Sequence, residues 1–282
     1  MPQTITTGYK ALVDAAEREI ETLPVEEAIK LAGRDRRSLC TSAGTSTRSV
    51  HGTRCVMYEL FVTNKNYSSW SLRPWIAMKL AGIEFDERVI PLYKPGSREQ
   101  VLKFSPAGKV PVLIDGDMQV WESLAILEHL AEKFPKAGLW PADARARSHA
   151  RVVANEMHGG FMPLRRNCPM NMWLPPKKRP QPDEVIDNVW RVDALWSDCR
   201  TRFGQNGPFL FGAFCAADAM YAPVVSRLHS YGLEVGSVSR AYMGAVMALP
   251  AWAAWWEAAL KEPWVMKGNE PDWPLVRGIA AR

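Results

Sequence analysis

The chain has 282 residues, a formal charge of +5 and 47% hydrophobic residues, which is enough for two domains with ordinary cores. No apolar run reaches the roughly 18 residues of a membrane span, and no element combines a basic face with interleaved aromatic residues, so neither a membrane nor a nucleic-acid partner is expected. The five scattered cysteines form no C-x-x-C pair and no zinc spacing, which favours a reduced cytoplasmic protein without a metal site.

The first 56 residues predict an extension rather than a domain. Residues 10–20 carry apolar side chains at helical spacing, and Pro24 begins a second short helix, but two short helices cannot bury a core alone. Residues 36–56 are rich in Ser, Thr, Gly and Arg and contain no acid, which predicts a linker or disorder. The run over 9–35 resembles the start of a rhodanese-like domain, but the active-site cysteine loop of that family is absent, so we expect no sulfurtransferase activity.

Residues 57–136 alternate between short apolar runs and helical patterns. Strands are predicted at 58–62, 87–90, 112–114 and 118–120, and a turn at 115–117 joins the last two into a hairpin. Helices are predicted at 71–82, 98–104 and 122–134. The order βαβαββα is that of a compact α/β domain.

The chain becomes helical after Pro141. Helical periodicity covers 143–167, 182–203, 216–231, 239–247 and 251–261, with proline-rich loops between the segments. This pattern predicts an all-α second domain over 142–270.

Four motifs in this order resemble those of the cytosolic glutathione S-transferases. They are YSSWSLR at 67–73, SPAGKVPVL at 105–113, WESLAI at 121–126 and FGAFCAAD at 211–218, and the resemblance covers 57–282. It implies a thioredoxin-like N-terminal domain followed by an all-helical C-terminal domain. It also implies glutathione as co-substrate, no metal, a homodimer in the cytoplasm and a role in detoxification.

The resemblance implies a strand-like binding mode for glutathione, an extended tripeptide. In the family the proline of the second motif is cis, which turns the Val110 backbone towards the ligand as a strand edge. Glu122 and Ser123 begin a helix, whose N-terminus favours a carboxylate. The implied glutathione contacts are Lys94, Lys109, Val110, Pro111, Glu122 and Ser123.

A hydroxyl in the first motif is expected to stabilise the glutathione thiolate. Ser68 follows the first strand at the spacing that resembles the catalytic serine of the zeta and tau classes. Ser69 and Ser71 compete as helix caps or second donors, and Tyr67 would serve in a tyrosine-type enzyme. Ser68, with Ser69 beside it, is the catalytic hypothesis.

Two further expectations concern the second domain. Apolar and basic residues near helical spacing predict an electrophile pocket lined by Trp70, His158, Phe161, Met162 and Arg165, with Met157 and Trp173 nearby. Asp218, near the start of helix 216–231, is implied to serve folding by accepting amide hydrogen bonds.

The leading function is conjugation of the glutathione thiol to a small apolar electrophile. One alternative is a glutathione-dependent cis–trans isomerase such as maleylacetoacetate isomerase, although Trp70 and Leu72 depart from the motif of that class. Another is a binding protein without catalytic activity. The retained Ser68, Glu122 and Ser123 favour an enzyme.

Overall fold

The computed structural model describes residues 58–92 and 94–266. The chain divides into two units, Met1–Cys55 and Val56–Arg282, and all described residues belong to the second. The extension predicted over residues 1–56 lies outside the described residues, as do 267–270 at the end of the predicted second domain.

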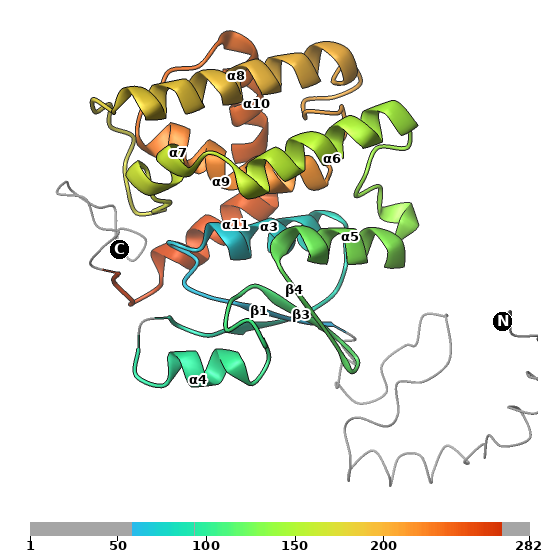
Figure 1. Ribbon diagram of the computed structural model, residues 1–282, viewed down its shortest axis with the longest axis vertical. Coiled ribbons are helices and arrows are strands. Elements are labelled where there is room, and N and C mark those ends of the chain that lie inside the picture. The colour runs from blue at the N-terminus through green and yellow to red at the C-terminus, as the bar shows by residue number, and fades with distance from the viewer. Residues whose placement is uncertain (1–57, 93, 267–282) are drawn as a thin grey trace, which may run out of the picture. The chain divides into compact units, whose positions relative to one another are not determined.

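A four-stranded mixed sheet forms the first half of this unit (Figure 1). Its strands are β1 (Tyr58–Val62), β2 (Asp86–Val89), β3 (Val112–Asp115) and β4 (Met118–Trp121). The strand order is β2-β1-β3-β4, with β1 parallel to β2 and antiparallel to β3. This arrangement confirms the predicted thioredoxin-like domain.

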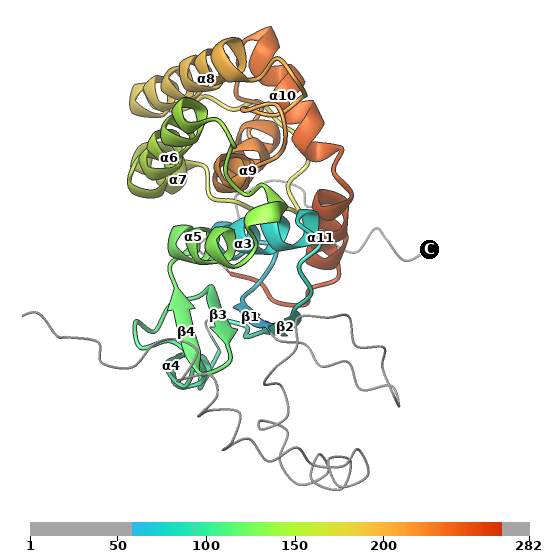
Figure 2. The ribbon, with the colours of Figure 1, turned by 90° about the vertical axis from the view of Figure 1, so that its right-hand side faces the viewer.

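Helices cover both faces of the sheet, which explains why the central strand β1 is buried almost throughout. Helix α4 (Ser97–Leu102) lies on one face, while α3 (Ser69–Leu80) and α5 (Ser123–Lys133) lie on the other (Figure 2). On the α4 side, Phe61 and Val112 of the sheet pack with Ile90 and Val101. A short 3₁₀ turn, Pro135–Ala137, ends this half.

The second half is all helical, as predicted (Figure 1). Its elements are α6 (Ala144–Gly159), α7 (Met162–Asn167), α8 (Asp183–Phe203), α9 (Ala216–Ser230), α10 (Ser237–Met247) and α11 (Pro250–Leu260). Helix α9 is buried at every position except His229 because it packs against α3 on one side and α6 on another. Within the described residues, no helix has the length and apolar character needed to cross a bilayer.

The single helix predicted over 143–167 is wrong, because the structure has two helices there. Helix α6 ends at Gly159, and α7 begins after Phe161, whose φ of 59° is left-handed. A Cβ at Gly160 would lie 2.5 Å from the carbonyl oxygen of Glu156, so only glycine fits this tight exit from α6. The break gives α7 a direction of its own.

Candidate active site

A cavity of about 460 Å³ opens where the end of β1, the segment before β3 and the start of α5 meet helix α7. Most of the residues in its wall are ones that the sequence motifs indicated. The wall is formed by Thr63, Ser68, Trp70, Leu92, Gly108, Lys109, Val110, Pro111, Glu122 and Arg165. The structure therefore brings three of the four motifs to one place.

Ser68 is the N-cap of α3 and faces this cavity. Its Oγ accepts the amide hydrogen of Ser71 at 3.3 Å and donates to the Ser71 Oγ at 2.8 Å. Its own amide donates to the Asn64 carbonyl oxygen at 2.9 Å, which fixes the loop before the helix. A hydroxyl so placed lies beside a helix N-terminus, where negative charge is favoured.

The other hydroxyls of the first motif are occupied or buried. Ser69 is 8% exposed and does not line the cavity. Ser71 is fully buried, and its Oγ also accepts the Thr63 amide hydrogen at 3.2 Å. The Tyr67 hydroxyl accepts the amide hydrogen of Met266 at 3.2 Å. Ser68 is thus the only serine of this motif in the cavity wall.

The segment before β3 forms another part of the cavity wall. The Val110–Pro111 peptide is cis, as predicted. Lys109 has a largely exposed side chain, and its Nζ lies 4.0 Å from Oε1 of Glu122. Lys94 is exposed and does not line the cavity, and its amide donates to the Ser97 Oγ.

The start of α5 holds Glu122 in an unusual backbone conformation. Its φ is 69°, and Phe161 is the only other non-glycine residue with positive φ in the described part of the chain. Such conformations cost roughly 1–3 kcal/mol and occur often at ligand sites. Ser123 follows Glu122 but is fully buried, with its hydroxyl 3.9 Å from Sδ of Met220.

Trp70 forms the part of the wall next to the helical half. The guanidinium carbons of Arg73 and Arg165 lie 4.1 Å and 4.6 Å from its ring centroid, and the His158 ring lies at 5.2 Å. Burial, and then the charge of Arg73, lowers the pKa of His158, which favours the neutral imidazole near pH 7. The His158 Nε2 is 3.9 Å from the Glu122 carboxylate.

Several residues expected in the electrophile pocket lie outside the cavity wall. The His158 ring packs edge-on against the Trp70 ring, Phe161 is 7% exposed in the core, and Met162 is 48% exposed. Trp173 is fully buried and donates its indole hydrogen to the Ala259 carbonyl oxygen, so it is a core residue. Met157 is also in the core.

Thr63 and Leu92 line the cavity although no motif contains them. Thr63 directly follows β1, and Leu92 comes shortly after β2, which is parallel to β1. Because the carboxyl ends of adjacent parallel strands meet at one edge, this topology could have indicated both residues.

Asp218 lies in the core of the helical half, away from the cavity. Its two carboxylate oxygens accept the amide hydrogens of Leu210 at 3.0 Å and Cys215 at 2.8 Å. Burial raises the pKa of Asp218 to about 6. These contacts tie the loop before α9 to the first turn of that helix.

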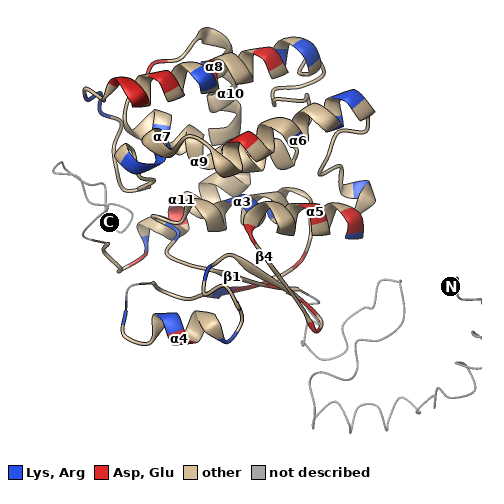
Figure 3. Ribbon diagram, viewed as in Figure 1, with Lys and Arg blue, Asp and Glu red and all other residues tan. Residues whose placement is uncertain are grey.

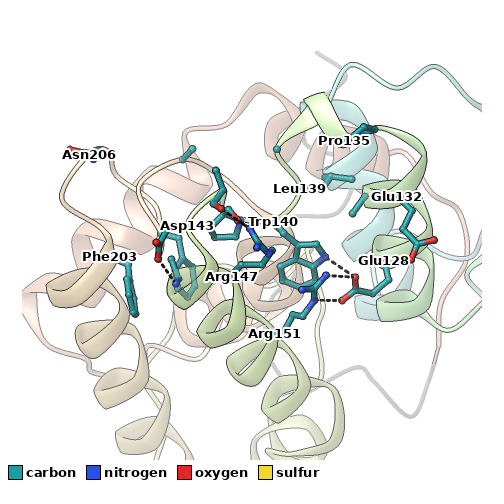
Figure 4. A pocket seen from close by; sticks show the side chains of 17 residues that line it. Glu128, Glu132, Pro135, Leu139, Trp140, Asp143, Arg147, Arg151, Phe203 and Asn206 are labelled. Carbon is teal, nitrogen blue, oxygen red and sulfur yellow. Dashed lines mark hydrogen bonds and ion pairs between the residues drawn. The ribbon is translucent and has the colours of Figure 1, made fainter.

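A larger cavity of about 710 Å³ lies between α5 and α6 (Figure 4). None of the residues expected to bind glutathione lines it. The Glu128 carboxylate of α5 accepts hydrogen bonds from Trp140 and from Arg151 of α6, at 2.9 Å each. Among the described residues, no cluster of three His, Cys, Asp or Glu could hold a metal ion.

Comparison with known proteins shows similarity to glutathione S-transferases. The family model described as "Glutathione S-transferase, N-terminal domain" matches residues 67–133, which include most of the cavity wall. The chain is also 26% identical over 230 residues to a glutathione S-transferase of Triticum aestivum, covering 74% of this chain and 94% of the wheat protein. The chain is therefore similar to a glutathione S-transferase over most of its length.

Other comparisons cover parts of the chain or its fold. A maleylacetoacetate isomerase of Rattus norvegicus is 35% identical over 113 residues, which are 39% of this chain and 50% of the rat protein. The chain likewise spans about half the length of several other curated relatives that it matches. A Burkholderia glutathione transferase homologue with bound glutathione has the same fold, with a TM-score of 0.55 at 21% identity over 72% of this chain and 97% of that one.

Proposed function

We propose that this protein conjugates the thiol of glutathione to a small electrophile, with the Ser68 hydroxyl stabilising the thiolate. The observation that carries the proposal is the position of Ser68. Ser68 lines the cavity at the N-terminus of α3, together with Val110 and Glu122.

The proposed chemistry begins with loss of the thiol proton to solvent. A free thiol has a pKa of about 8.5, so only a few per cent is ionised at pH 7. A hydroxyl donating to the sulfur contributes about 1.5–3 kcal/mol, and a helix N-terminus roughly 0.3–1 kcal/mol, in favour of the thiolate. At about 1.36 kcal/mol per pKa unit, these two effects lower the thiol pKa by about two units. Ser68 stays protonated, and it would turn its one hydroxyl hydrogen from the Ser71 Oγ to the sulfur.

The tripeptide would lie along the segment before β3. The Val110 backbone would pair with its cysteinyl unit as an added strand. Glu122 would pair with the ammonium group of the ligand, and the amide of Ser123 would serve the γ-glutamyl carboxylate at the α5 N-terminus. Lys109 is exposed enough to reach the glycyl carboxylate, and Lys94 would have to swing towards the cavity to assist.

The test compares Ser68→Ala with Ser68→Thr, which keeps the hydroxyl. We expect Ser68→Ala to raise the pKa of bound glutathione, followed by thiolate absorbance against pH, by one to two units. Ser68→Thr should stay near the wild type. A thiolate titration that is the same in Ser68→Ala and wild type, or that shifts only in Ser69→Ala, would remove Ser68 from this role.

The match to maleylacetoacetate isomerases supports a second candidate, glutathione-dependent isomerisation. Both reactions use the same thiolate, but an isomerase returns glutathione at the end of each cycle. Stoichiometric loss of free thiol during turnover therefore marks conjugation, and turnover without thiol loss marks isomerisation. Tight glutathione binding without turnover of any electrophile would indicate a binding protein.

We further propose a cytoplasmic homodimer. Exposed apolar side chains occur on β4 and α6, with Met118 49% and Val152 58% exposed. Light scattering should give twice the chain mass for the wild type and a smaller value for Met118→Asp with Val152→Asp. Trp190→Asp, which removes an exposed apolar side chain on α8, is the matched control. Cell fractionation tests the location.

A further inference from the structure

Three arginines lie close to one another, and two of them, Arg73 and Arg165, contact the Trp70 ring. Arg73 of α3 and Arg227 of α9 are buried, and Arg165 of α7 is partly buried. Burial and mutual repulsion lower the pKa of both Arg73 and Arg227. Within the described residues, no carboxylate lies within 4.0 Å of any of the three guanidinium groups. Helix α7 carries basic residues and no acidic ones (Figure 3).

The three guanidinium groups differ in how fully they are bonded. Arg227 has a structural role, because its Nη1 donates to the carbonyl oxygens of Cys168 at 2.5 Å and Arg165 at 3.4 Å. Arg73 donates from Nε to the Met220 carbonyl oxygen, but its Nη1 is buried without a partner. Among the described residues, the hydrogen bonds that the Arg165 side chain donates are two long ones of 3.4 Å, from Nη1 to the His158 and Gly160 carbonyl oxygens.

Two of these arginines contact the same indole ring at the candidate active site. Arg73 and Arg165 each lie within 4.6 Å of the Trp70 ring centroid. Trp70 and Arg165 line the same cavity as Ser68. A molecule that reaches a sulfur beside Ser68 would therefore bring its remaining atoms close to an under-bonded guanidinium.

We propose that Arg165, supported by the charge of Arg73, binds a carboxylate carried by the electrophile. The proposal rests on the glutathione transferase function and specifies its substrate class as anionic electrophiles. A planar guanidinium with free donors is the side chain best suited to hold a carboxylate by paired hydrogen bonds. The break after Gly159 supports this role because it sets α7, and with it Arg165, against the cavity.

The competing ligand for Arg165 is a carboxylate of glutathione itself. The tripeptide is expected along the sheet edge, where Lys109 and the α5 N-terminus already supply cationic and dipolar partners. Arg165 reaches the cavity from the helical half. If Arg165 binds glutathione, Arg165→Gln should raise the KM for glutathione. If Arg165 binds the electrophile, that KM should stay unchanged.

The test uses a matched pair of electrophiles, a chlorodinitrobenzoate with chlorine para to the carboxylate and its methyl ester. In both, the sulfur bonds to the ring carbon, chloride leaves with the bonding electron pair, and the thiol proton goes to solvent. We expect the wild type to have at least about tenfold higher kcat/KM for the anion, which corresponds to about 1.4 kcal/mol. In Arg165→Gln the ratio should fall to within about threefold of one.

Arg166→Gln is the matched control, because Arg166 is the next residue of α7 but is exposed and does not line the cavity. This variant should keep the wild-type preference. A wild type without preference for the anion, or a preference that survives Arg165→Gln, overturns the proposal. An Arg165→Gln variant that only raises the KM for glutathione assigns Arg165 to the tripeptide and also overturns it.

A binding measurement keeps the test independent of turnover. Calorimetry should show dinitrobenzoate, without chlorine, binding to the glutathione-loaded wild type and about tenfold more weakly to Arg165→Gln. If neither electrophile reacts but this difference is found, the transferase function fails and the anion subsite stands. If both electrophiles react and dinitrobenzoate does not bind, the subsite fails and the transferase function stands.

Discussion

The carboxylate of Glu262 accepts the backbone amide hydrogen of Lys65 at 2.6 Å, across 197 positions of sequence. Its second oxygen accepts the amide hydrogen of Asn66 at 3.0 Å. The indole of Trp255 in α11 donates to the Lys65 carbonyl oxygen at 3.0 Å. The loop that leads to Ser68 is therefore fixed by hydrogen bonds to Trp255 and Glu262, near the end of the described chain.

Removing this contact should disturb the site without touching the ligand. Glu262→Ala leaves two buried amides unpaired, so we expect a loss of about 1–3 kcal/mol in the free energy of unfolding and a several-fold lower kcat. Urea denaturation and steady-state kinetics measure the two effects. Glu257→Ala removes an exposed glutamate of α11 and should change neither. Equal stability of the two variants would contradict the role of Glu262.

Ser71 should act on the thiolate through Ser68. The buried Ser71 hydroxyl is 2.8 Å from the Ser68 Oγ, so it orients the proposed donor. In Ser71→Ala we expect the pH profile of kcat/KM to move upward by about half a unit or more, with a loss of about 1–3 kcal/mol in stability because the Thr63 amide loses its acceptor. A loss of stability with an unchanged pH profile would leave Ser71 a purely structural residue.

Asp218 should make the stability of the protein depend on pH. Its pKa is raised to about 6 by burial, against about 4 in an unfolded chain. The folded state therefore binds more protons between these values, so the contribution of Asp218 is complete below about pH 4 and is lost as pH rises through 6. The two-unit shift corresponds to about 3 kcal/mol.

Asp218→Asn provides the comparison, since asparagine does not titrate. The difference in unfolding free energy between wild type and variant should shrink between about pH 4 and 7 and stay constant above, as measured by urea denaturation. The variant should be less stable throughout, because its amide group cannot accept both the Leu210 and Cys215 hydrogen bonds. A difference that does not vary with pH would show that the folded and unfolded pKa values are the same.

Cys215→Ser should stabilise the protein. Cys215 is the buried N-cap of α9, and a thiol is a weaker acceptor for the first-turn amides than a hydroxyl. We expect a gain of about 1 kcal/mol, seen as a higher Tm in thermal unfolding. Cys199→Ser, at a buried cysteine inside α8 with no capping role, should instead lower the Tm. A fall in Tm for both variants would contradict the capping argument.

Most helices and strands could be predicted because local signals mark their ends. Gly82 follows α3 with positive φ, and Pro135 follows α5. The break between α6 and α7 was missed although Gly159 and Gly160 mark it, because Met157, Phe161 and Leu164 keep a helical spacing across it. The contact of Glu262 has no local signal at all, because a lone glutamate after a helix does not indicate a partner 197 residues away.

In the candidate site, too, residues in short motifs could be predicted, whereas contacts between distant segments could not. Ser68, Val110 and Glu122 belong to short motifs whose chemistry is readable from adjacent residues. Arg165 was expected in the electrophile pocket, but its place beside Arg73 and Arg227 depends on two other helices. Charge balance at a site formed by several distant segments requires the three-dimensional arrangement.

The hydrogen bonds from the loop before Ser68 to Glu262 also affect the order in which the protein folds during synthesis. The ribosome makes Lys65 and Asn66 early, but the acceptor for their amides, Glu262, emerges almost two hundred residues later. The sheet and α3 can form while translation continues, yet the nascent chain cannot complete the loop that presents the proposed donor. Catalytic competence should therefore appear only after Glu262 has left the ribosome, and a fragment that stops before α11 should lack it even where its sheet is folded.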